Sequence, residues 1–342
     1  MSKDQGASAV SGGWSRRRVL RTTAGVGVAG AAAAVGSNVL AQGSKLRPLT
    51  LAWNANAVCL SAVPVAVERG FFEKQGLKVE LVNFAGSTDQ LLETIATGKA
   101  DAAVGMVHRW IKPLESGLDV KLVGSSHGGC SRLVGYGPAG ITSIAKLKGK
   151  TIAVSDLNSP GKNFFSVLLT KAGLDPEKDV SWRQFPGDML GLAVEKGEAH
   201  AIADGDPNLF LIERRTKGLV ELATNLSGEY AAKTCCVVGV GGKLIRSDKP
   251  LVASLVRAIN QGSEFVADYP NETARIYSPY SKVPVEDLRA VLGTLTHRNH
   301  PSGVALQKEV EFYARDFKLV GVLKPSTDAA RFAQHVTVDV LA

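Results

Sequence analysis

Short apolar runs alternate with amphipathic segments along most of the chain, and glycines follow many of them. Between residues 82 and 102, apolar residues recur at helical spacing, as Leu91 and Ile95 show. The apolar runs that read as buried strands in the first part are 49–53, 79–82, 102–105 and 120–124. This alternation is typical of an open α/β sheet with helices on its faces.

The same order of elements returns later in the chain. Phe84-Ala85-Gly86-Ser87 is echoed by Phe185-Pro186-Gly187-Asp188, and the stretch 97–102 is echoed by 196–201. Both copies contain a strand, a glycine turn, a helix, a glycine stop and another strand. The repeat therefore predicts two lobes of duplicated architecture.

Two segments, 132–136 and 235–240, are predicted to be crossover strands between the lobes. One lobe would comprise 46–134 with 240–342, and the other 135–239. Helices that should cap the first lobe are predicted at 250–269, 272–277, 285–295, 305–320 and 326–334. Two connecting strands would suit a hinge.

Residues 1–41 carry a separate signal. Arg16-Arg17 precede an Ala/Gly-rich apolar run at 24–35, and Ala41 ends a small-residue cleavage site. This pattern resembles a twin-arginine export signal, which predicts a protein of the periplasm. The run falls short of the about 20 apolar residues of a membrane span, although a retained anchor is the alternative.

Composition and charge favour a globular protein that does not bind nucleic acid. The 342 residues are 45% hydrophobic and 21% charged. Half of the net charge of +8 lies in 1–41, and the other basic residues are scattered. We find no phosphate-loop lysine motif, no His-Glu-x-x-His and no convincing nucleophile–base pair. The sequence therefore predicts a binding protein that needs no cofactor, rather than an enzyme.

Polar residues cluster where strands end and helices begin. Helix N-termini at 86–88 and 158–161 offer N–H groups to an anion or carbonyl, although their hydroxyls could equally be ordinary N-caps. Strand ends of an open α/β sheet are where ligands bind. The candidate ligand-binding residues are Asn54, Asn56, Ser87, Thr88, His108, His127, Cys130, Asn158, Ser159, Asp204 and Asp206.

Cysteines and histidines form a further group near the predicted strand ends. Thiolates with imidazoles suit copper, zinc or another soft ion, and Cys130, Cys235, Cys236 and His127 are candidate ligands. Cys59 belongs to the same group. Two alternatives remain, a disulfide from Cys130 to Cys235 or Cys236, and inert buried thiols.

Several motifs resemble the periplasmic substrate-binding proteins of ABC importers in the nitrate/sulfonate/taurine family. They are the segments 64–82, 98–105 and 147–154 and the helix start Asp248-Lys249-Pro250, within a likeness over 46–323. The resemblance implies a two-lobed, type II periplasmic-binding-protein fold of the Venus-flytrap kind. It also implies capture of a small polar or anionic solute, and delivery by a monomer to a permease in the inner membrane.

The same superfamily includes the pyrimidine synthase of fungal thiamine biosynthesis and binders of thiamine pyrimidines. Cys235-Cys236 and His108 resemble its cysteine-rich motif and the histidine after its third strand. Val104-Gly105 provide no lysine to hold pyridoxal phosphate. Thiamine-pyrimidine binding or synthesis is thus one alternative function, and binding of a soft metal or thiol-reactive ligand is another.

Overall fold

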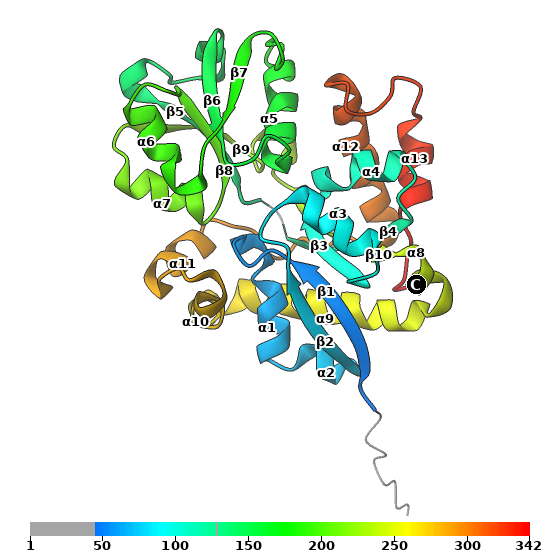
Figure 1. The fold of residues 1–342 in the computed structure, drawn as a ribbon. Helices are drawn as coiled ribbons and strands as arrows, with labels where there is room; N and C mark the ends of the chain where they lie inside the picture. The colour runs from blue at the N-terminus through cyan, green and yellow to red at the C-terminus, as the bar shows by residue number, and fades with distance from the viewer. Residues whose placement is uncertain (1–44, 128) are drawn as a thin grey trace, which may run out of the picture. The chain divides into compact units, whose positions relative to one another are not determined.

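Two five-stranded sheets form the framework of the computed structural model, which describes residues 45–127 and 129–342 (Figure 1). The first sheet has the order β2 (Leu77–Asn83), β1 (Arg47–Trp53), β3 (Ala102–Met106), β10 (Cys236–Gly241), β4 (Val120–His127). The second has the order β7 (Val180–Gln184), β6 (Lys150–Val154), β8 (Ala201–Gly205), β5 (Ser131–Tyr136), β9 (Leu219–Thr224). The two-lobed α/β fold is confirmed. The predicted export signal lies outside the described residues.

The chain passes between the sheets twice, from β4 to β5 and from β9 to β10. The predicted crossover strands exist, but each belongs to the sheet that it enters: β5 pairs with β8, and β10 pairs with β3. The passages therefore lie before Ser131 and before Cys236, earlier than the boundaries at 134/135 and 239/240 that the sequence suggested.

The sequence repeat corresponds to repeated backbone geometry. Phe84 N donates to Trp53 O and Phe185 N to Val154 O, both at 3.0 Å. In each sheet one strand runs antiparallel to both of its neighbours: β10 between β3 and β4, and β5 between β8 and β9. These are the strands that enter from the other lobe, and the remaining strand pairs are parallel. The two lobes therefore place equivalent loops at equivalent strand ends.

Helices of the first lobe are α1 (Ala62–Glu68), α2 (Phe71–Lys74), α3 (Thr88–Ala96) and α4 (Ile111–Glu115). Those of the second are α5 (Pro160–Lys171), α6 (Leu190–Glu195) and α7 (Asn208–Arg215). Ser87 and Ser159 cap α3 and α5, because their hydroxyls accept from Gln90 N and Lys162 N. Gly70, with φ 65°, separates α1 from α2 in a left-handed conformation that favours glycine.

The C-terminal helices cover the first sheet. They are α8 (Gly242–Ser247), α9 (Lys249–Asp268), α10 (Pro270–Ser281), α11 (Val285–Leu292), α12 (Gly303–Leu319) and α13 (Ala329–Val336). Helix α9 packs against α1, α2 and β4, while α12 contacts β4, α13 and also α5 of the second lobe. Among the described residues, no helix combines the length and apolar character needed to cross a membrane.

An aromatic cluster joins the second lobe to α12. The Phe164 ring of α5 lies 4.8 Å from the Tyr230 ring and 5.5 Å from the His108 ring, between centroids. Asp316 of α12 accepts from Lys171 Nζ at 2.7 Å and from the Tyr230 hydroxyl at 2.5 Å. Burial of these rings and a paired carboxylate hold this side of the two lobes together.

Candidate functional site

A cavity of about 530 Å³ lies where the strand ends of the two sheets meet. Its first-lobe wall includes Asn54, Cys59 and Arg109, and its second-lobe wall includes Ser155 and Asp204. Cys130, on the first connecting segment, also lines it. Both lobes and a connecting segment thus contribute to one site, as the Venus-flytrap arrangement requires.

The second-lobe wall is acidic, with Asp156, Asp188, Asp204 and Asp206 lining the cavity. Asp204 lies near the end of β8 and accepts from Ser155 Oγ at 2.9 Å and from Asn208 Nδ2 at 2.6 Å. Burial raises the pKa of the Asp204 carboxyl. Two of its acceptor positions are therefore engaged inside the protein.

Asp206 lines the cavity but also makes structural contacts. Its fully buried carboxylate accepts from Arg132 Nε at 2.8 Å and from Phe210 N at 3.2 Å. Burial raises its pKa, although the charge of Arg132 acts in the opposite direction. The Asp206 carbonyl accepts from Val58 N of the first lobe at 3.3 Å, so this turn also links the two walls.

The first-lobe wall carries one cation, Arg109, directly after β3. Its Nη1 donates to the Thr88 hydroxyl, and that hydroxyl lies 3.4 Å from the Asn158 carbonyl of the second lobe. Desolvation lowers the pKa of Arg109, but a guanidinium remains charged at neutral pH. The two walls therefore have opposite charge.

Six of the predicted ligand residues line the cavity: Asn54, Asn56, Cys130, Ser159, Asp204 and Asp206. Ser87, Thr88, His108 and Asn158 are not part of its lining. Ser87 serves as the N-cap of α3, and Thr88 holds Arg109. His127 ends β4, and its side chain lies outside the described part of the structure.

His108 lies in the aromatic cluster and not on the cavity wall. It is 3% exposed and packs against Tyr313 and Phe317, with ring centroids 4.8 and 5.1 Å away. Burial lowers its pKa to about 4, so the imidazole is neutral at pH 7. The sequence could not distinguish this buried position from the strand-end position, because β3 turns into a 3-10 helix at Val107–Arg109.

Several cavity residues were not identified from the sequence: Met106, Arg109, Ser155, Asp156, Asp188 and Asn208. The sequence carried a positional signal for three of these residues. Arg109 and Asn208 each follow a strand end within a few residues, and Asp188 occupies the repeat position of Ser87. Applying the strand-end rule to both copies of the repeat would have found these three.

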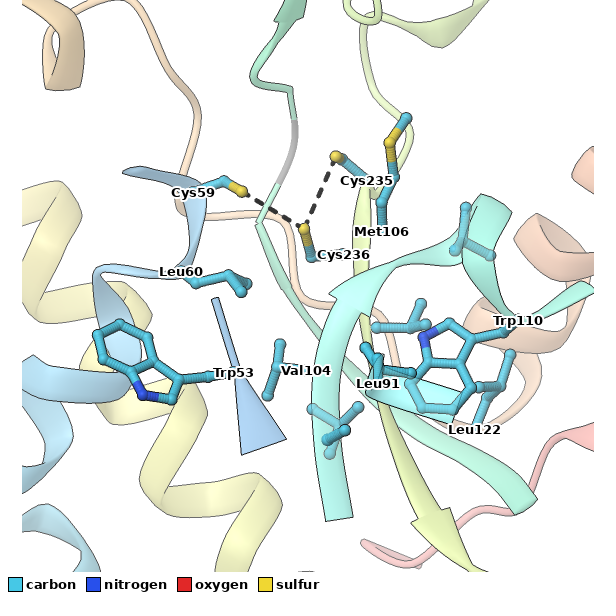
Figure 2. Packing of buried hydrophobic residues seen from close by; sticks show 14 of the residues in the cluster. Trp53, Cys59, Leu60, Leu91, Val104, Met106, Trp110, Leu122, Cys235 and Cys236 are labelled. Carbon is cyan, nitrogen blue, oxygen red and sulfur yellow. Dashed lines mark hydrogen bonds between the residues drawn. The ribbon is translucent and has the colours of Figure 1, made fainter. Parts of the chain in front are cut away.

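All four cysteines of the chain lie close together, and three of them, Cys59, Cys130 and Cys236, line the cavity. Figure 2 shows Cys59, Cys235 and Cys236 side by side. Cys236 Sγ lies 3.6 Å from Cys59 Sγ and 3.8 Å from Cys235 Sγ, and none of the four forms a disulfide. Cys130 hydrogen bonds with Cys235 and Cys59, and these contacts together with burial raise its pKa. The alternative of a Cys130–Cys235 or Cys130–Cys236 disulfide is thus not present.

The spacing Gly124-Ser125-Ser126-His127-Gly128 matches the Gly-x-Ser-x-Gly pattern of hydrolase nucleophiles. Ser126, however, lies within β4, and it is fully buried. Its carbonyl accepts from Ser263 Oγ of α9 at 2.6 Å. A nucleophile of that class needs an exposed strand-to-helix turn, so this serine has a structural position.

Solved structures of solute-binding proteins share this fold. The alkanesulfonate-binding protein SsuA from Xanthomonas axonopodis pv. citri, bound to MOPS, is 18% identical, with a TM-score of 0.69 over 83% of this chain and 97% of that one. The aliphatic sulphonate binding protein SsuA from Escherichia coli is 16% identical, with a TM-score of 0.70 and coverage of 84% and 91%.

The nitrate-binding protein NrtA from Synechocystis PCC 6803 is 15% identical, with a TM-score of 0.70 and coverage of 86% of each chain. No curated protein matches the sequence. Residues 60–273, more than half of the chain, match the family described as NMT1/THI5 like. The protein is a member of the NMT1/THI5-like family.

Proposed function

We propose that the protein is the solute-binding component of an ABC importer and captures a small polar solute between its lobes. The observation that carries this proposal is one cavity built from the strand ends of two sheets that are connected by two segments. Structural neighbours with this fold are sulfonate- and nitrate-binding proteins. No bond-making step is part of the proposal.

The charge of the cavity favours one solute class within the sulfonate, nitrate and taurine group. Arg109 on the first wall suits a sulfonate, and Asp156 and Asp188 on the second suit an ammonium group. Nitrate offers nothing to the acidic wall. A small aminosulfonate of the taurine type, negative at one end and positive at the other, matches both walls.

Such a solute would favour closure of the lobes because it contacts both. A ligand shifts a conformational equilibrium only as far as it binds one state better than the other. An aminosulfonate gains its second charged contact only when the walls approach, so it would bind the closed state more tightly than the open state. Closure also excludes water, which strengthens both charged contacts.

The test is a comparison of taurine, ethanesulfonate and nitrate by isothermal titration calorimetry and thermal shift. Taurine should bind best and raise the melting temperature most, because ligand that binds the native state stabilises it. Asp188→Asn should weaken taurine and leave ethanesulfonate unchanged. Glu195→Gln, at an exposed position of α6 outside the cavity lining, is the matched control. Equal and negligible responses to all three solutes would refute the proposed solute class.

The importer role also requires a location and a partner. We propose export through the twin-arginine pathway, a periplasmic location, and a monomer that docks on an inner-membrane permease. Replacing Arg16 and Arg17 with lysine should keep the protein in the cytoplasm, as cell fractionation would show. Normal export of that variant would contradict the twin-arginine assignment but not the solute proposal.

A further inference from the structure

Four thiols from three separate parts of the chain converge beside the cavity. Cys59 lies in the 3-10 helix Val58–Leu60 after β1, Cys130 precedes β5, and Cys235 and Cys236 lie at the start of β10. Cys59, Cys130 and Cys236 line the cavity together with Met106. Only tertiary structure brings these groups together, and it gathers every cysteine that the chain has.

Two of the sulfur–sulfur distances match those between neighbouring ligands of a thiolate metal centre. Metal–sulfur bonds of about 2.3 Å in a tetrahedron place neighbouring sulfurs about 3.8 Å apart. The Cys236 sulfur lies 3.6 Å from that of Cys59 and 3.8 Å from that of Cys235. Cys130 hydrogen bonds with both Cys59 and Cys235, which closes the group into a ring of four.

The surroundings of this ring, which we name the thiol cluster, suit a soft cation. Sulfur ligands prefer soft ions such as Cu(I) and Cd(II), and the Met106 thioether adds a further soft donor to the cavity. Arg109 is close enough to Cys236, Cys59 and Cys130 for electrostatic interaction. Its positive charge would offset the excess negative charge of a centre with several thiolates.

The thiols are not already arranged around a metal position. Within the described residues, no group of three or more His, Cys, Asp or Glu side chains has the geometry of a ready metal centre. In their present arrangement the sulfurs of Cys59, Cys235 and Cys236 contact one another, so ion binding would require these side chains to rotate toward a shared position. Ion binding would replace sulfur–hydrogen contacts with sulfur–metal bonds.

We propose that the thiol cluster of Cys59, Cys130, Cys235 and Cys236 binds one soft, thiophilic metal ion at the base of the cavity. Metal–sulfur bonds form as the S–H protons pass to solvent, and no atom changes oxidation state. This site goes beyond solute capture and does not depend on it. Because Cys130 and Cys235 lie on the two connecting segments and Cys236 begins β10, the ion would tie both segments to Cys59 and stiffen the pivot.

Cadmium is the direct probe of the site, because thiolate-to-cadmium charge transfer gives an ultraviolet band that hard ligands do not produce. Fully reduced protein should bind about one Cd(II) per chain and show this band. The melting temperature should also rise, and Mg(II) should have neither effect. In a urea concentration just below the unfolding transition, where buried thiols become reactive, bound Cd(II) should protect the four thiols from iodoacetamide, a readout that needs no variant.

Variants separate this proposal from the solute proposal. Cys59→Ser with Cys236→Ser should lower the intensity of the band by about half or more and weaken cadmium binding by at least about 100-fold, since two of the four thiolate ligands are lost. The Asp188→Asn variant should keep the cadmium band but bind taurine more weakly. A melting curve and circular dichroism of the metal-free double variant establish that it folds.

Three results would overturn the proposal. One is reduced protein that shows no band with either Cd(II) or Cu(I). Another is a band of undiminished intensity in the folded double variant. The third is thiol protection that is absent in the unchanged chain at saturating Cd(II), which would leave the cluster as ordinary buried thiols.

Discussion

The two lobes share a backbone plan and differ in the chemistry at the ends of their equivalent central strands. Strand β3 ends at Met106 and leads to Arg109, whereas β8 leads through Asp204 to Asp206. One wall of the cavity is therefore sulfur-rich and cationic, and the other is acidic. The comparison shows that topology fixes where the site lies, while a few strand-end residues decide what it binds.

The first helix of each lobe also has a different partner. Helix α1 packs on α9, with Gly262 so close that an added Cβ would lie 2.4 Å from the Ala62 carbonyl oxygen. Helix α5 packs on α12 through the aromatic cluster. Lobe one thus has its own helical cover, while lobe two shares a helix from the end of the chain.

The largest expected effect comes from breaking that shared contact. Phe164→Ala removes a fully buried ring that touches both lobes and should lower the free energy of unfolding by about 3–5 kcal/mol. Urea denaturation monitored by circular dichroism measures this loss. Leu157→Ala, at an exposed position of the same lobe, should cost less than about 0.5 kcal/mol. A similar small loss at Phe164 would show that the lobes do not depend on the cluster.

The second prediction concerns His108, which occupies the strand end that is acidic in the other lobe. Its folded-state pKa of about 4 lies below the ordinary 6.5, because burial excludes the charged form and the nearby Cys235 opposes this only in part. The unfolded chain therefore binds the proton first as the pH falls. Stability is complete above pH 6.5 and should drop by about 3 kcal/mol by pH 4.

Urea denaturation of His108→Phe across this pH range checks the prediction. The groups facing His108 are the rings of Phe164, Tyr313 and Phe317, so phenylalanine fits the apolar setting. The variant should lose stability less steeply toward acid than the unchanged chain. His335→Phe, on an exposed face of α13, should keep the original slope. Parallel pH profiles for all three proteins would contradict a buried neutral imidazole.

The third prediction tests the opposite charges of the two walls. Arg109→Gln should weaken taurine and ethanesulfonate alike, whereas Asp156→Asn should weaken taurine only. A hydrogen bond to a charged group contributes about 1.5–3 kcal/mol, so each loss should be about 10- to 100-fold in Kd. Calorimetry measures it. If Asp156→Asn weakened both solutes equally, the two walls would not divide the solute as proposed.

The smallest effect is expected at the two helix caps, which are equivalent in the lobes but unequal at the cavity. Ser87→Ala and Ser159→Ala should each cost about 1 kcal/mol of stability, because each leaves a helix N–H without its acceptor. Only Ser159 lines the cavity, so only its replacement should change taurine affinity. Thermal melts and titrations of the pair measure both effects, and an affinity change at Ser87 would contradict the assignment.

Local pattern determined the elements, the repeat and the serine caps of this protein, because helix and strand periodicity, glycine turns and N-cap hydroxyls act within a few residues. The repeat also indicated the two lobes, and positions at strand ends and helix starts indicated Asn54, Asp204 and Ser159, which line the cavity. Tertiary structure alone decided that the His108 side chain packs in an aromatic cluster and that Asp206 forms an ion pair with Arg132. It also decided that Cys59, Cys130 and Cys236 lie together. Those outcomes depend on contacts between residues far apart in the chain, which the spacing of residues in one sequence does not encode.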